Sequence, residues 1–327
     1  SEARVSDNQC YSGSKIIIPN SVLYDGKNYP VTSIADSAFY SNWSLIEVTI
    51  PNSVTTIGDY VFASCSGLKT VTIPNAMTSI GRNAFYGCTG LTEVTIPNSV
   101  TTIGERAFYR CTGLQTVIWN ARNAEYYNGL SYDSPFSNCD RLTDFVFGEE
   151  VEHIPAYLCR ELTLLNTIVI PNSVTSIGTN AFSFCRGLTK VSIPNSVKTI
   201  GNWAFYRCTG LTTVTIGNSV TSIGNRAFYS CTSLTEVSIP NSVKTIEFRA
   251  FEGCTGLKTV TIGNSVTTIG ESAFYSCTSL TEVSIPNSVT SIGSSVFEDC
   301  SGLKTVTIGN SVTTIGESAF FFMYLEA

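Results

Sequence analysis

The sequence predicts a solenoid of about thirteen stacked units, with a parallel β-sheet along one side. Twelve leucines from Leu45 to Leu303 recur every 23 residues, except for one interval of 28 residues between Leu114 and Leu142. Each interval carries the same apolar pattern, and an earlier, irregular unit covers about residues 15–44. One such unit could not bury its own apolar side chains, so stacking must build one continuous core.

The elements can be assigned within the clearest unit, residues 91–113, whose positions we number from its leucine. Positions 4–6, Val94-Thr95-Ile96, alternate as in a short strand, and Pro97 ends it because proline has no N–H for a ladder. Asn-Ser then suits a turn, and a second short extended segment leads to a bend at Gly104. The i, i+1, i+4 spacing of Ala107, Phe108 and Cys111 predicts one inward-facing helical turn.

Composition excludes several classes of function. A net charge of −6 argues against a nucleic-acid binder, which needs a basic face for phosphates. No apolar run approaches the roughly 18 residues of a membrane span. The polar segment Ser1–Cys10 is no signal peptide, so we expect a mature or trimmed form of an exported protein. A single histidine, His153, and the lack of any nucleophile–base pair, phosphate loop or metal cluster predict no enzyme, cofactor or metal site.

The repeated pattern L-x-x-V-x-I-P-N-S-V-x-x-I-G-x-x-A-F-x-x-C over about residues 16–325 resembles the leucine-rich repeat class, and within it the BspA-like type of bacterial and protozoan surface proteins. The resemblance implies a curved solenoid with its parallel sheet on the concave face and short helical turns or irregular segments on the convex face. It also implies an extracellular, cell-surface location and adhesion to host or neighbouring-cell surface or matrix proteins.

The largest departure from the repeat begins in the unit from Leu114, where Trp119 replaces the inward isoleucine and Asn120 replaces proline. The second extended segment is lost, and a stretch with five extra residues runs from Ala121 to Ser134. Tyrosine, tryptophan and arginine are common interface anchors, so the loop of residues 119–134 is a candidate binding site. The alternative is that its aromatic residues only pack the loop onto the solenoid. The candidates in this loop are Trp119, Arg122, Tyr126, Tyr127 and Tyr132.

Other departures define the expected regions of the chain: 1–44 as N-terminal cap and irregular repeat, 45–118 as regular repeats, 119–164 as divergent repeats, and 165–327 as regular repeats. Asp25-Gly26 predicts a hairpin turn, and the hairpin is expected to cap the core. The acidic cluster at residues 149–153 is interpreted as a solvated face rather than a metal or general-base site. The C-terminal end is expected to be truncated or uncapped, which would invite end-to-end self-association.

Two ladders of side chains are expected along the stack. Ten of the twelve cysteines occupy position 21, where each thiol has two equivalent neighbours, so we interpret them as buried free thiols. Partial pairing of adjacent rungs is the alternative. Tyrosines at position 19 are expected to pack between turns, with a convex adhesive stripe as the alternative.

Positions 2, 3 and 5 would face the concave side, where Thr and Ser dominate position 5 and acids alternate with Thr at position 3. The lysines of position 2 are expected beside glutamates of the next rung. We predict a non-enzymatic protein-binding surface here and in the loop. A glycan-binding surface, a structural spacer for another domain and, more remotely, an ice-binding array are the alternatives. The candidate residues of this face are Glu47, Thr70, Glu93, Thr116, Asp144, Lys190 and Glu236.

Overall fold

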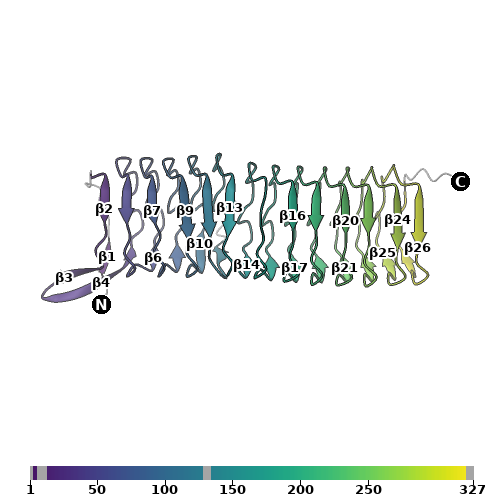
Figure 1. The fold of residues 1–327 in the computed structure, drawn as a ribbon, viewed down its shortest axis with the longest axis horizontal. Coiled ribbons are helices and arrows are strands. Elements are labelled where there is room, and N and C mark those ends of the chain that lie inside the picture. Colours follow the sequence, from purple (N-terminus) through teal and green to yellow (C-terminus); the bar gives the residue numbers. More distant parts are fainter. Residues whose placement is uncertain (1–2, 6–12, 128–133, 322–327) are drawn as a thin grey trace. The chain divides into compact units, whose positions relative to one another are not determined.

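The computed structural model describes residues 3–5, 13–127 and 134–321, and the chain divides into two compact units, Ser1–Leu164 and Leu165–Ala327. Each unit is a parallel β-solenoid, with about twelve turns in total (Figure 1). The expected count of about thirteen is not confirmed, because an antiparallel hairpin interrupts the N-terminal segment. The described residues form no helix, and none of their segments could therefore cross a membrane as a long apolar helix.

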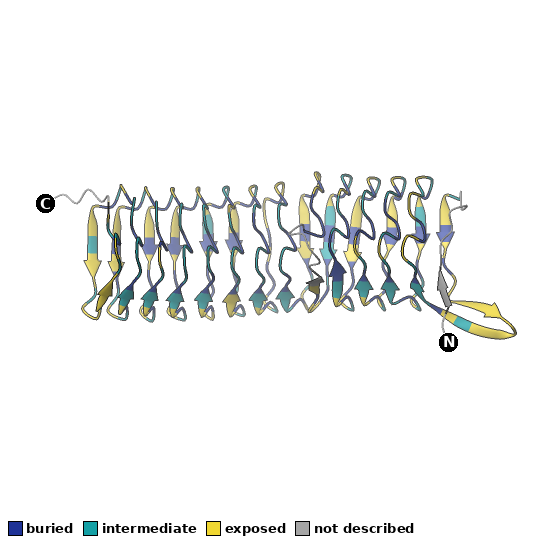
Figure 2. Ribbon diagram, turned by 180° about the vertical axis from the view of Figure 1, so that it is seen from behind, coloured by how far each residue is buried: buried dark blue, intermediate teal, exposed yellow. Residues whose placement is uncertain are grey.

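The first strands of successive turns pair in parallel through equivalent residues, in two three-stranded sheets in unit 1 and in one four-stranded and one two-stranded sheet in unit 2. Unit 1 contributes β2 (Lys15–Ile17), β5 (Glu47–Thr49), β7 (Thr70–Thr72), β9 (Glu93–Ile96), β11 (Thr116–Trp119) and β13 (Asp144–Phe147). Unit 2 contributes β16 (Lys190–Ser192), β18 (Thr213–Thr215), β20 (Glu236–Ser238), β22 (Thr259–Thr261), β24 (Glu282–Ile285) and β26 (Thr305–Ile308). Positions 4 and 6 are buried and positions 3 and 5 face outward, as the alternation predicts (Figure 2), except in β26, where Val306 is half-buried and Ile308 is exposed.

The second extended segment of each turn forms another parallel ladder, at positions 12 and 13 before the bend. In unit 1 it comprises β4 (Lys27–Ile34), β6 (Thr56–Ile57), β8 (Ser79–Ile80), β10 (Thr102–Gly104) and β12 (Glu125–Tyr127), and β14 (His153–Ile154) follows. In unit 2 it comprises β15 (Ser176–Ile177), β17 (Thr199–Ile200), β19 (Ser222–Ile223), β21 (Thr245–Ile246), β23 (Thr268–Ile269), β25 (Ser291–Ile292) and β27 (Thr314–Ile315).

The N-terminal hairpin is confirmed, but its capping role is not. Strand β3 (Ser21–Tyr24) pairs antiparallel with β4, and Asp25 and Gly26 form the two-residue turn with φ values of 47° and 70°. All of β3 is exposed, so the hairpin does not cover the core. The strand that extends the second ladder beyond β4 is instead β1 (Ala3–Val5), which pairs with β4 in parallel.

The predicted helical turn at positions 17–21 is wrong. In the turn from Leu188, Trp203 and Arg207 have φ values of 53° and 55°, and a right-handed helix cannot continue through left-handed residues. Alternate N–H groups instead donate to the next turn: Trp203 to the Asn225 carbonyl at 2.9 Å and Phe205 to the Ala227 carbonyl at 2.8 Å. This turn side, which we define as positions 15–22, is therefore a row of stacked β-turns.

The core is a set of side-chain ladders that repeat once per turn. Phenylalanines of position 18 stack in each unit, for example Phe205 on Phe228 with ring centroids 5.2 Å apart and planes 4° apart. All eleven cysteines of the described residues are buried free thiols, which confirms the sequence interpretation. Ladder thiols in both units donate to carbonyls of the preceding turn, as Cys88 does to Phe62 at 3.1 Å and Cys231 does to Phe205 at 3.2 Å. Cys10 lies outside the described residues.

Candidate functional site

The outward side chains of the first ladder form the surface that the sequence predicts as concave. We call positions 3 and 5 of these strands the strand face. In unit 1 the ladder register places Glu47 beside Thr70, and it places Thr116 between Glu93 and Asp144. In unit 2 it places Thr213 between Lys190 and Glu236. The candidate residues of this face are thus direct neighbours within each unit.

Threonine hydroxyls divide into two groups in unit 2. At position 2 the hydroxyl of Thr212 donates to the Thr189 carbonyl at 2.9 Å, and Thr235 donates to Thr212 at 3.2 Å. These hydroxyls hold neighbouring turns together. Within the described chain, the side chains at positions 3 and 5 of β18, β20 and β22 have no hydrogen-bond or ion-pair partner. Their hydroxyl and carboxylate groups are therefore available to a ligand.

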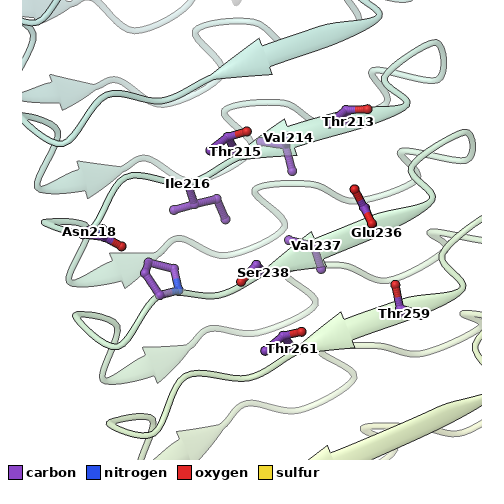
Figure 3. A pocket seen from close by; sticks show the side chains of 11 residues that line it. Thr213, Val214, Thr215, Ile216, Asn218, Glu236, Val237, Ser238, Thr259 and Thr261 are labelled. Atoms are coloured by element: carbon purple, nitrogen blue, oxygen red, sulfur yellow. The ribbon is translucent and has the colours of Figure 1, made fainter.

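A shallow groove of about 360 Å³ runs over these three strands of unit 2 (Figure 3). Glu236 is its only charged lining residue and lies between Thr213 and Thr259, while Ser238 lies between Thr215 and Thr261. Asn218 and Pro240 line the groove beyond the ends of the strands. No lining residue is aromatic, so the groove offers hydrogen-bonding groups around one carboxylate but no ring on which a sugar could stack.

The expected pairing of position-2 lysines with glutamates is not formed here. Among the described ion pairs, none joins Lys258 to Glu236 or Glu282. In unit 1, by contrast, the Lys15 ammonium lies 2.7 Å from the Glu47 carboxylate, and Thr143 donates to Asp144 at 2.7 Å. Some charged groups of the strand face in unit 1 are therefore bound by neighbouring side chains, whereas Glu236 in the groove of unit 2 has no ion pair among the described residues.

A set of apolar residues at position 5, where other turns carry Thr or Ser, belongs to the strand face but was not predicted as part of it. In unit 1, Ile118 pairs with Val146, whose side chain is 51% exposed. In unit 2, Val169 is 79% exposed and lines a second groove of about 530 Å³ together with Pro194 and Asn195. The interruption of the Thr/Ser row at these positions was a signal visible in the sequence.

The structure corrects two expectations about the loop of residues 119–134. Trp119 is fully buried, with its ring 6.4 Å from those of Phe136 and Phe145, so it cannot contact a partner directly. The second extended segment is not lost, because β12 pairs with β10 and sets Tyr126 opposite Ile103 and Tyr127 opposite Gly104. Tyr132 lies outside the described residues.

Arg122 is exposed and is held by an acidic residue of the following turn. Its guanidinium donates to the Glu152 carboxylate, which also accepts from Asn123 at 3.0 Å. The hydrogen bond from Asn123, with that from Arg122, lowers the pKa of Glu152, and the Glu152 carboxylate raises the pKa of Arg122. The pair ties the start of the loop to the next turn, so Arg122 is engaged structurally.

The acidic cluster has exposed members in Glu149 and Glu150, whereas Glu152 is taken up by the pair with Arg122. The described residues contain no group of three or more His, Cys, Asp or Glu side chains placed to hold a metal ion.

Four tyrosines of position 19 stack in pairs between turns, as expected, whereas Tyr40 is exposed. Tyr86 stacks on Tyr109 with ring centroids 5.5 Å apart, and Tyr206 stacks on Tyr229 at 4.9 Å.

Comparison with known proteins supports the repeat assignment. The family model for the BspA type leucine rich repeat region matches residues 32–158, 129–243 and 221–327. A leucine-rich repeat protein from Bacteroides ovatus is 29% identical, with a TM-score of 0.66, over 94% of this chain and 84% of that one. A leucine rich cell surface protein from Faecalibacterium prausnitzii is 28% identical over 94% of this chain and 90% of that one, with a TM-score of 0.43. No curated protein sequence matches.

Proposed function

Because the chain belongs to the BspA type leucine rich repeat family, we propose that it is a non-enzymatic, extracellular scaffold that binds a partner protein on its strand face. The observation that carries the proposal is the groove over β18, β20 and β22. Its outward hydroxyl and carboxylate groups have no partner within the described chain, while equivalent groups at position 2 are consumed by the scaffold.

The chemistry of the groove favours a protein over a glycan. Hydroxyls both donate and accept, and the Glu236 carboxylate accepts from a lysine, an arginine or a backbone amide of a partner. The adjoining groove around Val169 supplies apolar area, and a protein interface combines an apolar centre with a polar rim. A glycan site would be expected to include aromatic rings, and neither groove has one among its lining residues.

The test blocks the groove with long charged side chains. In the variant Thr215→Lys/Thr261→Lys, two lysines flank Ser238 at exposed positions. We expect this variant to weaken binding to a partner protein at least about tenfold, because the lysines occupy a groove only a few side chains wide. Binding is measured by surface plasmon resonance against a panel of purified extracellular matrix proteins, with a glycan array run in parallel.

The matched control is Thr221→Lys/Thr267→Lys, which makes the same substitution at position 11, away from the strand face. Neighbouring turns already carry Lys198 and Lys244 at this position, so the fold accommodates it. Binding that survives in the strand-face variant, or recognition of glycans alone, contradicts the proposal. Surface labelling of intact cells with a membrane-impermeant biotin reagent tests the extracellular location.

A further inference from the structure

The turn side of unit 2 separates its charges along the stack. Its first three turns, which begin at Leu165, Leu188 and Leu211, each carry one arginine and no acid on this side. The fourth turn carries both Arg249 and Glu252, which form an ion pair at 3.2 Å. The last three turns carry only acids here. The arginines of the first three turns are Arg186, Arg207 and Arg226, and the acids of the last three are Glu271, Glu298, Asp299 and Glu317.

The whole of unit 2 has the same asymmetry. Residues 165–250 contain seven basic and two acidic residues, a net charge of +5. Residues 251–327 contain two basic and seven acidic residues, a net charge of −5. The total charge of −6 conceals this division, because the charges of the two halves cancel.

Two arginines of the basic half lie against aromatic rings, although the charge of Arg226 also favours the ionised form of the Glu252 carboxylate in the next turn. The Arg226 guanidinium lies 4.8 Å from the Phe248 ring centroid and 5.9 Å from that of Trp203, and the Arg207 guanidinium lies 5.4 Å from that of Tyr206. Among the described ion pairs, neither arginine has a carboxylate partner. A guanidinium stacked on a ring keeps the N–H groups along its edge for bidentate contact with a carboxylate.

The charges are arranged antisymmetrically about the fourth turn. One turn before the fourth, Arg226 occupies position 16, and one turn after it, Glu271 occupies the adjacent position 15. Two turns before the fourth, Arg207 occupies position 20, and two turns after it, Asp299 occupies the same position. A two-fold axis running across the stack at the fourth turn would bring each arginine opposite an acid of a second copy, and a closed two-fold interface requires such self-complementarity.

From this pattern we infer that the turn side of unit 2 docks against the same surface of a second copy, with the two stacks antiparallel. The occupant is this chain itself, because a foreign acidic protein would complement only the basic half and would be repelled by the acidic half. The half-buried rings of Trp203 and Phe248 lie between the charges and supply apolar contact area. This lateral contact differs from end-to-end association, and it leaves the strand face of the proposed function free.

The test reverses charges in two complementary variants. Arg207→Glu/Arg226→Glu makes both halves of the surface acidic, and Glu271→Arg/Glu298→Arg makes the opposite half basic. Asp299 is kept because it accepts a hydrogen bond from the Tyr275 hydroxyl at 2.7 Å. Sedimentation velocity of the full chain at low salt should show a monomer–dimer equilibrium that weakens about tenfold or more as salt shortens the range of electrostatic interactions.

Each charge-reversal variant alone should be monomeric, since like charges then face each other, and an equimolar mixture of the two should dimerise again. The mixture also shows that both variants are folded. Lys198→Glu/Lys244→Glu changes the net charge as much as the arginine variant but lies at position 11, and it should dimerise like the unaltered chain. A wild-type chain that stays monomeric at low salt overturns the inference. This holds also if that monomer binds polyglutamate, a probe for a foreign acidic partner. A mixture that remains monomeric overturns it as well.

Discussion

The regular turn from Leu211 in unit 2 and the divergent turn from Leu142 in unit 1 have the same length but different cores. In the regular turn Phe228 lies between the parallel rings of Phe205 and Phe251, each 5.2 Å away. In the divergent turn Cys159 fills the equivalent position. Its large side chains lie on the first strand instead, where Phe145 meets Phe136 edge-on at 5.6 Å.

The difference shows that the backbone ladder and the stacked core are separable. The first ladder continues through β11 and β13 although proline, Asn-Ser and the inward aliphatic residues are replaced. A stacked column needs an identical ring in the turn on either side, whereas an edge-to-face cluster fills irregular space. The divergent core can therefore accommodate the bulk of Trp119 beside the five extra residues of the preceding turn.

The largest expected effect comes from emptying the same core position in the two turns. Phe228→Ala should cost about 3–5 kcal/mol of unfolding free energy, because it removes a fully buried ring and leaves a cavity between two others. Cys159→Ala should cost only about 1 kcal/mol, since one small apolar group is lost. Urea unfolding measures both, and equal costs would contradict the distinction between the two cores.

The next effect concerns the glycines on which neighbouring turns stack. A Cβ on Gly217 would overlap the Pro194 carbonyl oxygen and lie 2.6 Å from its carbon, so Gly217→Ala should cost about 1–3 kcal/mol. In the divergent turn a Cβ on Gly148 would meet mainly the side-chain oxygen of Asn120, which can rotate away. Gly148→Ala should therefore cost less than about 1 kcal/mol in the same unfolding experiment. The reverse order would show that backbone spacing does not limit the regular turns.

The third prediction uses position 21, which holds Cys254 in a regular turn and Leu162 in the divergent one. Burial raises the pKa of Cys254 to about 12 from an ordinary value of 9.0. Its stabilising contribution is therefore complete below about pH 9 and is lost between pH 9 and pH 12, at about 1.4 kcal/mol per pH unit. Cys254→Ala should remove this share of the alkaline destabilisation, and Leu162→Ala should not change the pH dependence. Urea unfolding from pH 8 to 11 measures the slopes, and parallel slopes for wild type and Cys254→Ala would refute the prediction.

The sequence predicted the strands but not the turn side, for a physical reason. Strand alternation determines burial directly, so positions 4 and 6 were assigned correctly in turns such as Val94–Ile96. An α-helical turn and two β-turns bring residues i, i+1 and i+4 to the same side, so their apolar spacing is identical. The distinguishing left-handed residues are filled by side chains such as Trp203 and Arg207, which give no glycine signal.

The candidate site was predictable in its register and less so in its chemistry. Glu236 and its neighbours follow from the repeat, whereas the use of Thr212 and Thr235 hydroxyls within the scaffold depends on distances between turns. Trp119 was chosen for its residue type, although its inward position in the repeat already indicated burial. The half-buried Ile118 and the exposed Val146 could have been found by noting where apolar residues replace Thr or Ser at position 5.

The smallest expected effect distinguishes two carboxylates of the divergent region, namely Glu152, which is paired with Arg122, and the exposed Glu149. Glu152→Gln should loosen the contact with Arg122 and accelerate amide exchange at residue 152, whose N–H donates to the Arg122 carbonyl at 2.9 Å. Because hydrogen bonds lower the pKa of Glu152 below its ordinary 4.5, the folded state gains from this pair above that pH and loses the gain as the pH falls. Protection in the wild type should therefore decline on acidification, and the variant should lack this pH dependence.

Glu149→Gln, at an exposed residue of the same cluster, is the control and should leave exchange at residue 152 unchanged. If both variants exchange alike, the pair does not hold the start of the loop, and Arg122 becomes available to a partner.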